Sequence, residues 1–287
     1  MKVVTTAESL AAFRGGVFVP TMGALHEGHA ALVRRAAELA APGGLPVVVS
    51  VFVNPTQFND PRDLERYPRT LDADVRVCES ALGGTGMSCV FAPPVEVMYP
   101  PEMGGRGGVR VPELPAAATV PLLEDAHRPG HFAGVCQVCL RLFELVRPAQ
   151  AVFGEKDWQQ LAVVRAMAAR EMPGLEIIGH ETVREGDGLA MSSRNTLLMP
   201  QDRRRAPAMA RALVEAGRHD DPAEAEQAGR RVLLANRLVP EYVAVRDSAT
   251  LGPPKPGQPA RVLAAAKCGN VRLIDNAGWP GFRLETA

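Results

Sequence analysis

The sequence predicts an α/β protein in which a doubly wound parallel sheet is followed by a smaller α+β domain. In the first part of the chain, short β-branched runs alternate with helical patterns, which is the order of elements in such sheets. These runs are continuously apolar, as is typical of parallel strands that helices cover on both faces. The length of 287 residues, at about 150 residues per domain, corresponds to roughly two domains.

The first half of the chain contains a β-α-β-α-β pattern. In order, the pattern predicts a strand at 16–20, a helix at 28–41, a buried strand at 45–53, a helix at 70–82 and a strand at 89–92. The segment 93–121 that follows is rich in Pro, Gly and Ala. We therefore expect a long surface excursion there rather than a linker between domains.

The same alternation resumes and ends near residue 183. We expect, in order, a helix at 131–146, a strand at 149–153, a helix at 157–171 and a strand at 175–183. The pattern then changes to helices at 201–217 and 222–236 and strands at 241–246 and 261–267, with a Pro-rich break before the last strand. These patterns divide the chain into a doubly wound domain, residues 1–183, and a compact C-terminal α+β domain, residues 184–287.

The charge balance and hydropathy argue against two classes of partner. The 32 Lys and Arg residues cancel the 32 Asp and Glu residues, so the chain lacks the positive footprint of non-specific nucleic-acid binding. No apolar run approaches the ~20 residues that span a bilayer. We therefore expect neither a nucleic-acid partner nor a membrane.

The five cysteines do not predict a disulfide framework. Their number is odd and the chain starts without a secretory segment, so we expect a reducing, cytoplasmic compartment. Cys136 and Cys139 have the spacing of a redox or zinc pair. Because their neighbours form an apolar helical pattern and no second pair exists in the sequence, we interpret them as core residues.

The first candidate site follows the strand predicted at 16–20. The residues VPTMGALHEGH (19–29) lead through a glycine-containing turn into a helix. Ligands of open parallel sheets bind at the carboxyl ends of strands, and helix N-termini favour anions, so we expect a phosphate here. His26 and His29 can each donate to developing phosphate charge. The alternative is a pair of ordinary capping or solvated histidines, and the H-E-x-x-H spacing of zinc proteases is absent.

Two later segments carry further groups suited to phosphate. In FGEKDWQQ (153–160), Lys156 is one of only four lysines and lies where a mobile cation can reach a phosphate. In EGDGLAMSSRN (185–195), two serines and Arg194 suit pyrophosphate oxygens on a bent, movable loop. Each segment alone is equally typical of a charged turn or a solvated loop. Together with the first motif, they predict three phosphate-binding loops at successive strand ends.

A fourth polar segment, FVNPTQF (52–58), also follows a strand. Gln57 is an uncharged group suited to bind a hydroxyl and a carboxylate at the mouth of the site. Asp72 and Asp74 could hold a magnesium ion on a nucleotide. The alternative for both aspartates is that they are N-terminal helix acids, which the helix dipole favours.

Together these segments resemble the pantoate–β-alanine ligase family, an HIGH-type member of the nucleotidylyltransferase superfamily. The resemblance is carried by VPTMGALHEGH, VSVFVNPTQF, DLERYPRTLDAD, RPGHFAGV, VRPAQAVFGEKDWQQL, VREGDGLAMSSRN and VRLIDN, and so spans nearly the whole chain. It implies a Rossmann-like N-terminal domain and a C-terminal lid domain, in a homodimer. It also implies ATP- and Mg²⁺-dependent condensation of pantoate with β-alanine, in coenzyme A biosynthesis.

The resemblance also assigns roles to particular residues. Nucleotide-binding residues are implied at Met22, Gly23, Ala24, Leu25, His26, Glu27, Gly28, His29, Gly154, Glu155, Lys156, Asp157, Val183, Met191, Ser192, Ser193 and Arg194. Catalytic roles are implied for His29, His26, Lys156, Ser192, Ser193 and Arg194, and Gln57 and Gln160 would hold pantoate. Arg128, with Glu124 in a flexible-loop segment beside the site, is a further substrate-binding candidate.

The chain departs from the family pattern at several positions. Thr56 replaces a frequent Met and Trp158 replaces a usual Phe or Tyr. Ala73 interrupts an acidic run, which leaves Asp74 as the better metal candidate.

The resemblance implies a two-step reaction. The pantoate carboxylate would attack the α-phosphorus of ATP, and the amine of β-alanine would then attack the adenylated carbonyl and expel AMP. Two other functions compete with this one. They are a nucleotidyltransferase that leaves the nucleotide on its product and a nucleotide-binding regulator that has lost catalysis.

Overall fold

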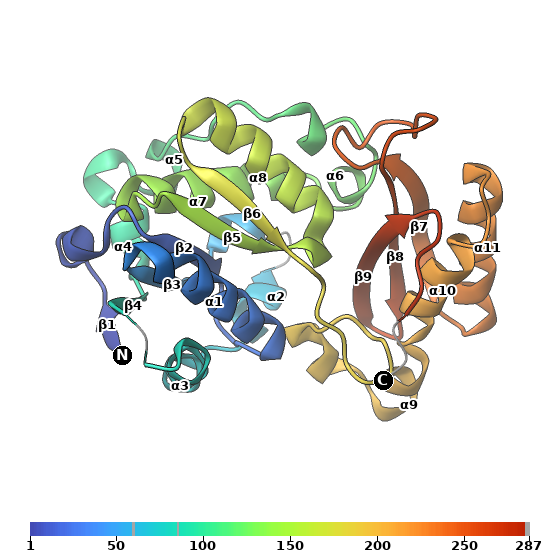
Figure 1. The fold of residues 1–287 in the computed structure, drawn as a ribbon, viewed down its shortest axis with the longest axis horizontal. Helices are drawn as coiled ribbons and strands as arrows, with labels where there is room; N and C mark the ends of the chain where they lie inside the picture. Colours follow the sequence, from blue (N-terminus) through green and yellow to red (C-terminus); the bar gives the residue numbers. More distant parts are fainter. Residues whose placement is uncertain (59–60, 85, 285–287) are drawn as a thin grey trace.

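Six parallel strands form one sheet in the part of the chain that the computed structural model describes, residues 1–58, 61–84 and 86–284 (Figure 1). The order in the sheet is β1-β4-β3-β2-β5-β6. The strands are β1 (Lys2–Val4), β2 (Val17–Thr21), β3 (Val47–Val51), β4 (Ser88–Phe91), β5 (Gln150–Gly154) and β6 (Glu176–His180). From β2 the chain winds outward to β3 and β4 in one direction and later to β5 and β6 in the other. The predicted doubly wound parallel sheet is therefore confirmed.

Helices cover both faces of this sheet, as its continuously apolar strands require. On one face, α1 (Glu27–Ala40) and α3 (Leu71–Leu82) share a buried cluster with Val17 and Val19 of β2. On the other face, α7 (His131–Val146) and α8 (Trp158–Glu171) share a cluster with Phe18. Neighbouring residues of β2 thus serve opposite faces, and the core is continuous above and below the strand that leads into the first motif.

The connections between these elements contain short helices. These are α2 (Pro61–Arg66), α4 (Val95–Met98), α5 (Gly105–Gly108) and α6 (Glu124–His127). Met98 and Tyr99 are only 0% and 2% exposed and belong to the main core cluster. The expectation that segment 93–121 is a surface excursion is therefore wrong near its start, where apolar side chains between the prolines pack under α7.

A second, antiparallel sheet follows in the order β7-β8-β9. Its strands are β7 (Val239–Asp247), β8 (Ala260–Cys268) and β9 (Val271–Trp279), and its helices are α9 (Pro200–Arg205), α10 (Ala208–Ala216) and α11 (Pro222–Ala235). These elements enclose a core cluster of their own. Figure 1 shows β9 on the side of this sheet that faces the parallel sheet. The predicted α+β character is confirmed, while residues 285–287 of the predicted second domain lie outside the described residues.

Two elements of the C-terminal region differ from the prediction. The single helix expected at 201–217 is two helices, because Pro207 lacks the N–H that would continue α9 and instead begins α10. Strand β9 was not predicted, since the charged and polar residues Asp275 and Asn276 interrupt its apolar pattern. Both side chains are buried, at 3% and 2% exposed, and both are hydrogen-bonded. The short strand β1 was also not predicted.

The five cysteines are buried free thiols. Cys136 and Cys139 belong to α7 and to the main core cluster, which confirms their interpretation as core residues. Burial raises the pKa of the Cys136 thiol to about 12. Among the described residues, no helix has the length and apolar character that would let it cross a membrane.

Candidate functional site

A cavity of about 240 Å³ lies where β2, β3 and β5 end, and residues 181–183 and 191–194 form part of its wall. Most of the predicted ligands line it: Met22, His26, Gly28, His29, Gln57, Gly154, Lys156, Asp157, Gln160, Val183, Met191, Ser192, Ser193 and Arg194. His29 and Lys156 come from different strand ends and share this one cavity. The expectation that polar groups from three loops converge is therefore met by the geometry, while the role of each group stays a prediction.

Some residues of the predicted nucleotide set lie outside this lining. They are Gly23, Ala24, Leu25, Glu27 and Glu155. Glu27 is exposed and paired with Arg34. The Glu155 carboxylate is turned toward the C-terminal sheet, where its Oε2 lies 3.4 Å from Nη1 of Arg261. Any contact of these residues with a nucleotide would therefore have to come from their backbone or from a movement of the turn.

The two histidines form a reciprocal cap at the start of α1. Nδ1 of His26 accepts a hydrogen bond from the N–H of Gly28 at 3.1 Å, and Nδ1 of His29 accepts one from the N–H of His26 at 3.3 Å. Because both Nδ1 atoms act as acceptors, a neutral ring carries its proton on Nε2. A Cβ on Gly28 would come within 2.9 Å of the His26 ring, so this position requires glycine. The capping alternative is realised here, and it leaves the Nε2–H groups available.

The electrostatics of the cavity keep these rings neutral. Burial, the adjacent His26 and the Lys156 cation lower the pKa of His29 to about 3. Burial and Lys156 likewise lower the pKa of His26. A neutral imidazole beside the Lys156 cation can donate one hydrogen bond to an anion without itself being charged. The site is therefore suited to hold a polyanion with fixed cations and neutral donors together.

The turn before the histidines depends on Asp74. This carboxylate is 1% exposed, and it accepts hydrogen bonds from the N–H groups of Ala24 at 3.2 Å and Leu25 at 2.8 Å. Gly23 and Ala24 have φ values of +84° and +52°, a left-handed conformation that the carboxylate stabilises by satisfying the turn's donors. A side chain at Gly23 would lie 3.0 Å from the Asp74 carboxylate.

This geometry does not favour Asp74 as a magnesium ligand. Both of its oxygens accept hydrogen bonds from backbone or side-chain donors, and the residue is not part of the cavity lining. Within residues 1–58, 61–84 and 86–284, no three His, Cys, Asp or Glu side chains are grouped as a metal site would require. The protein residues thus do not form a cage for a resident metal, and a magnesium ion carried by a nucleotide would belong to the substrate.

A buried amide network supports Gln57 in the wall of the cavity, and the part of the cavity lined by Asn54 and Gln57 is called its amide end. Nδ2 of Asn54 donates to Oε1 of Gln57 at 3.1 Å and to the carbonyl of Gly134 at 3.2 Å. The Tyr99 hydroxyl donates to Oδ1 of Asn54 at 2.7 Å. A Cβ on Gly134 would lie 2.5 Å from the Thr56 carbonyl oxygen, so glycine allows α7 to approach this turn.

Several residues of the lining were not predicted from the sequence. Asn54, Tyr67, Glu181 and Thr182 are polar residues of this kind. Asn54 lies in the polar segment FVNPTQF, shortly after β3. Its place at the end of a strand could have identified it as a candidate. The hydroxyl oxygen of Thr182 is buried and has no hydrogen-bond partner among the described residues.

The loop with the two serines is braced rather than loose. Arg203 pairs with Glu185 at 2.6 Å and with Asp187 at 2.5 Å. Nδ2 of Asn195 donates to Glu185 at 2.7 Å and to the Ala190 carbonyl at 3.1 Å. The expected movable loop is therefore held at its base in this structure, and Ser192 and Ser193 line the cavity from that base.

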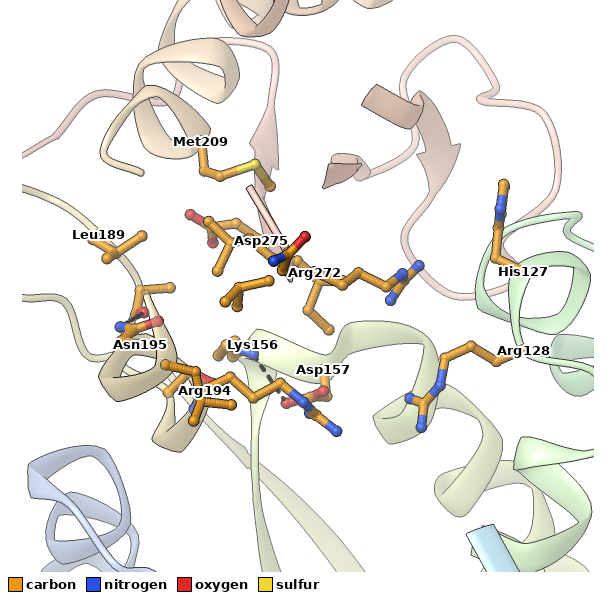
Figure 2. Close-up of a pocket in the computed structure, with 17 residues that line it drawn as sticks. His127, Arg128, Lys156, Asp157, Leu189, Arg194, Asn195, Met209, Arg272 and Asp275 are labelled. Carbon is orange, nitrogen blue, oxygen red and sulfur yellow. Dashed lines mark hydrogen bonds and ion pairs between the residues drawn. The ribbon is translucent and has the colours of Figure 1, made fainter. Parts of the chain in front are cut away.

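A second cavity, of about 320 Å³, adjoins the first between the two sheets. It shares Lys156, Asp157, Ser192 and Arg194 with the first cavity. Figure 2 shows Lys156, Asp157 and Arg194 on one side of it and Arg272 on the other. Arg128 lines this cavity rather than the first, so its predicted contact with substrate would be made from the side of the C-terminal sheet.

Arg128 is also connected to the amide end of the site. Its Nη1 lies 3.0 Å from Nε2 of His131, and Nδ1 of His131 lies 3.1 Å from the carbonyl oxygen of Gln57. Burial and the Arg128 cation lower the pKa of His131 to about 4, so this ring is neutral at neutral pH. His131 therefore connects Arg128, which lines the second cavity, to the backbone of Gln57, which lines the first, as an uncharged group.

Glu124 joins the segment before α7 to the C-terminal sheet. Its carboxylate, 6% exposed, accepts hydrogen bonds from both Nη groups of Arg272, at 2.6 and 2.7 Å, and from the Tyr242 hydroxyl at 2.7 Å. Burial opposes charge on Glu124, but the Arg272 and Tyr242 hydrogen bonds lower its pKa overall. The resemblance places this residue in a flexible-loop segment, whereas here it is fixed between the two sheets.

Comparisons with known proteins agree with this arrangement. The model of the pantoate-beta-alanine ligase family matches residues 2–278. A pantothenate synthetase of Thioalkalivibrio sulfidiphilus is 49% identical over 96% of this chain and 97% of its own length, and one of Vibrio cholerae is 47% identical over 90% and 86%.

Solved structures give the same result. Pantothenate synthetase from Thermus thermophilus superposes with a TM-score of 0.86 at 43% identity, covering 98% of this chain and 100% of that one. Pantoate-beta-alanine ligase from Francisella tularensis, complexed with beta-gamma ATP and beta-alanine, gives a TM-score of 0.75 at 30% identity and covers 97% of each chain.

Proposed function

The chain belongs to the pantoate–beta-alanine ligase family, and on this basis we propose how its cleft condenses pantoate with β-alanine at the expense of ATP. The overall reaction is an ATP-dependent ligation that passes through pantoyl adenylate and releases AMP and pyrophosphate. The observation that carries the assignment of roles is the convergence of His29, Lys156 and Gln57 on one cavity.

In the first step, an oxygen of the pantoate carboxylate attacks the α-phosphorus of ATP, and the bond from that phosphorus to the bridging oxygen breaks. Pyrophosphate leaves with the bonding electrons. Negative charge grows on the transferred and departing phosphate oxygens, where Lys156 and Arg194 supply cations and His29 supplies a neutral Nε2–H. The hydroxyl groups of Ser192 and Ser193, which line the cavity, can donate hydrogen bonds to these oxygens. His26 orients His29, since its N–H fixes the tautomer of that ring.

In the second step, the β-alanine amine, as the free base, attacks the carbonyl carbon of the adenylate. The bond between this carbon and the AMP oxygen breaks, and the amine loses a proton to solvent or to the departing phosphate. No side chain forms a covalent intermediate, so the protein contributes alignment, charge stabilisation and exclusion of water.

Pantoate is assigned to the amide end of the cavity. Gln57 and Gln160 both line it, and apolar neighbours such as Val138 and Leu142 complete the wall. Amides can bind a hydroxyl and a carboxylate together without adding a charge. Arg128, on the adjoining cavity, is a cation suited to the carboxylate of the incoming β-alanine.

Three further features of the family are proposals for this chain. ATP would enter as its magnesium complex, the chain would form a homodimer, and it would work in the cytoplasm. The first is checked by titrating activity against magnesium at fixed ATP, and the second by light scattering coupled to size-exclusion chromatography.

The function itself is tested by incubating the purified protein with ATP, Mg²⁺, pantoate and β-alanine, and then omitting each component in turn. We expect pantothenate, AMP and pyrophosphate in the complete mixture, identified by mass. A stable nucleotidylated product without AMP would instead indicate a nucleotidyltransferase. Binding of ATP without pyrophosphate release in the complete mixture would indicate a regulator.

A further inference from the structure

We propose that Asn276 is a positioning residue that holds the backbone of the Lys156 turn from the C-terminal sheet, and so sets where the Lys156 ammonium meets the phosphates. The proposal rests on the role given to Lys156 above and extends it to the second domain. Asn276 lies on β9, outside both large cavities, and touches none of the groups that would react.

The NH₂ group of the Asn276 side chain binds the turn that carries Lys156. Asn276 is 2% exposed, and its Nδ2 donates to the carbonyl oxygen of Glu155 at 2.8 Å and to that of Lys156 at 2.9 Å. A primary amide has two N–H donors, so both are accounted for. The two consecutive carbonyls of the turn are thereby tied to one atom of the other sheet.

The turn has few supports of its own. It is a single 3-10 turn, Glu155–Asp157, between β5 and α8, and no side chain in the described part of the chain caps either this turn or the start of α8. The residue at the junction, Asp157, has φ −97° and ψ 60°, outside the helical region. Because side-chain caps do not reinforce this single turn, the two bonds from Asn276 are a main side-chain support of its position.

The orientation of the Asn276 amide is determined by its other end. Oδ1 accepts a hydrogen bond from Nε of Arg261 at 2.8 Å. The Arg261 guanidinium lies over the Trp158 ring, 3.7 Å from its centroid, and its Nη1 is 3.4 Å from Glu155. An arginine has no acceptor, so only the amide oxygen can face it. The NH₂ group must then face the carbonyls of the turn.

The neighbouring residue on β9, Asp275, supports the backbone of the loop that carries Ser192 in a similar way. Asp275 binds Arg184 through two hydrogen bonds of 2.6 and 3.0 Å, and Arg184 donates to the Gly188 carbonyl at 3.0 Å. The Asn276 N–H donates to Asp275 at 2.8 Å. Successive residues of a strand point to opposite sides, so this pair reaches both loops at once. Strand β9 thereby fixes the spacing between Lys156 and the loop of Ser192.

This spacing matters because charge stabilisation depends on placement. A displacement of about 1 Å at a catalytic group can cost about a hundredfold in rate. Loss of the Asn276 bonds should displace Lys156 while leaving the pantoate end of the cavity intact.

The test is Asn276→Asp, which keeps the shape but replaces the donating NH₂ by an oxygen that repels the two carbonyls. We expect kcat of pantoate-dependent pyrophosphate–ATP exchange to fall about ten- to a hundredfold, with the KM for pantoate changed less than about twofold. The matched control is Asn236→Asp. Asn236 donates to the Val232 carbonyl at 2.8 Å at the end of α11, away from both cavities, and its variant should retain wild-type exchange.

A double-mutant cycle separates positioning of Lys156 from a general packing role. In a Lys156→Gln background, Asn276→Asp should lower exchange by less than about twofold, because the group through which it acts is gone. An equal fold loss in both backgrounds overturns the proposal, as does wild-type exchange in the single variant. Should the aspartate variant fail to fold by circular dichroism, Asn276→Ser carries the same cycle with the same two criteria. A wild-type protein without pantoate-dependent exchange would refute the proposed function instead.

Discussion

Arg272 of β9 holds both carboxylate oxygens of Glu124, at 2.6 and 2.7 Å, although 148 residues separate them in the sequence. Each of the two also has a further partner, Tyr242 for the acid and Glu241 for the base. A buried pair of this kind is costly to break on one side, because the remaining charge stays buried without its counterpart.

Glu124→Gln should lower the free energy of unfolding by about 3 kcal/mol, since it leaves Arg272 without its principal counter-charge. Chemical denaturation followed by circular dichroism measures this. The control is Glu38→Gln, which removes the exposed pair of Glu38 with Arg35 and should change stability by about 0.5 kcal/mol or less. Equal effects of the two substitutions would contradict the view that the Glu124–Arg272 pair stabilises the fold.

His29→Ala should lower kcat for pantoate-dependent pyrophosphate–ATP exchange by about a hundred- to a thousandfold, the usual cost of losing a donor to developing charge. The KM for ATP should change little, because the donor acts mainly in the transition state. His219→Ala, in the C-terminal region, is the control. An unchanged exchange rate in the His29 variant would remove this residue from the role.

The free energy of unfolding should fall as the pH is lowered from about 6.5 toward 4. Burial lowers the pKa of His29 to about 3 and that of His131 to about 4. In this pH range both histidines are therefore protonated in the unfolded chain before they are protonated in the folded chain. Each such proton contributes a slope of up to about 1.4 kcal/mol per pH unit.

The variant His29→Gln isolates one of these protons. Its unfolding free energy should depend less steeply on pH between 6 and 5 than that of the wild type. Denaturation curves at several pH values measure the two slopes. Identical slopes would mean that His29 is not held neutral in the folded protein.

Gln57→Ala should raise the KM for pantoate about tenfold or more while the KM for ATP stays within about twofold, because the amide binds the acid substrate in both the ground and transition states. Gln150→Ala, at the half-buried start of β5 and outside the cavity lining, is the control. Steady-state kinetics with each substrate varied separately measure both constants. A rise confined to the KM for ATP would contradict the assignment.

Asp74→Asn should destabilise the protein by about 1–3 kcal/mol, since it sets an NH₂ group against the backbone donors of Ala24 and Leu25. The magnesium concentration for half-maximal activity should stay at the wild-type value. Asp72→Asn, at the exposed start of the same helix, is the stability control. A large rise in the magnesium requirement of the Asp74 variant would restore its role as a metal ligand.

The parallel sheet could be predicted because its strands are short, continuously apolar and separated by amphipathic helices. Apolar runs such as that of β3 are typical of buried strands from composition alone. The motifs that follow these strands lie at the same edge of the sheet. The histidines, Lys156 and Gln57 were therefore placed in one cavity by topology, without knowledge of any contact.

What the sequence could not indicate are the contacts between distant polar residues. Asp275 and Asn276 break the apolar pattern of β9, and their burial makes sense only once Arg184 and the Glu155 carbonyl are seen beside them. Asp74 could not be separated from a metal ligand, because the donors that occupy it lie on a turn 50 residues earlier.

Trp158 belongs to helix α8 of the parallel-sheet domain, but its ring lies under Arg261 and its indole N–H donates to the Ser248 carbonyl at 3.1 Å, both in the other domain. Its intrinsic fluorescence is therefore a built-in reporter of whether the domains touch. The second tryptophan, Trp279, donates to Ala216 within the C-terminal domain, so a Trp158→Phe variant provides the background emission. Any change in this contact on substrate binding would therefore register in the fluorescence in real time, without an attached dye.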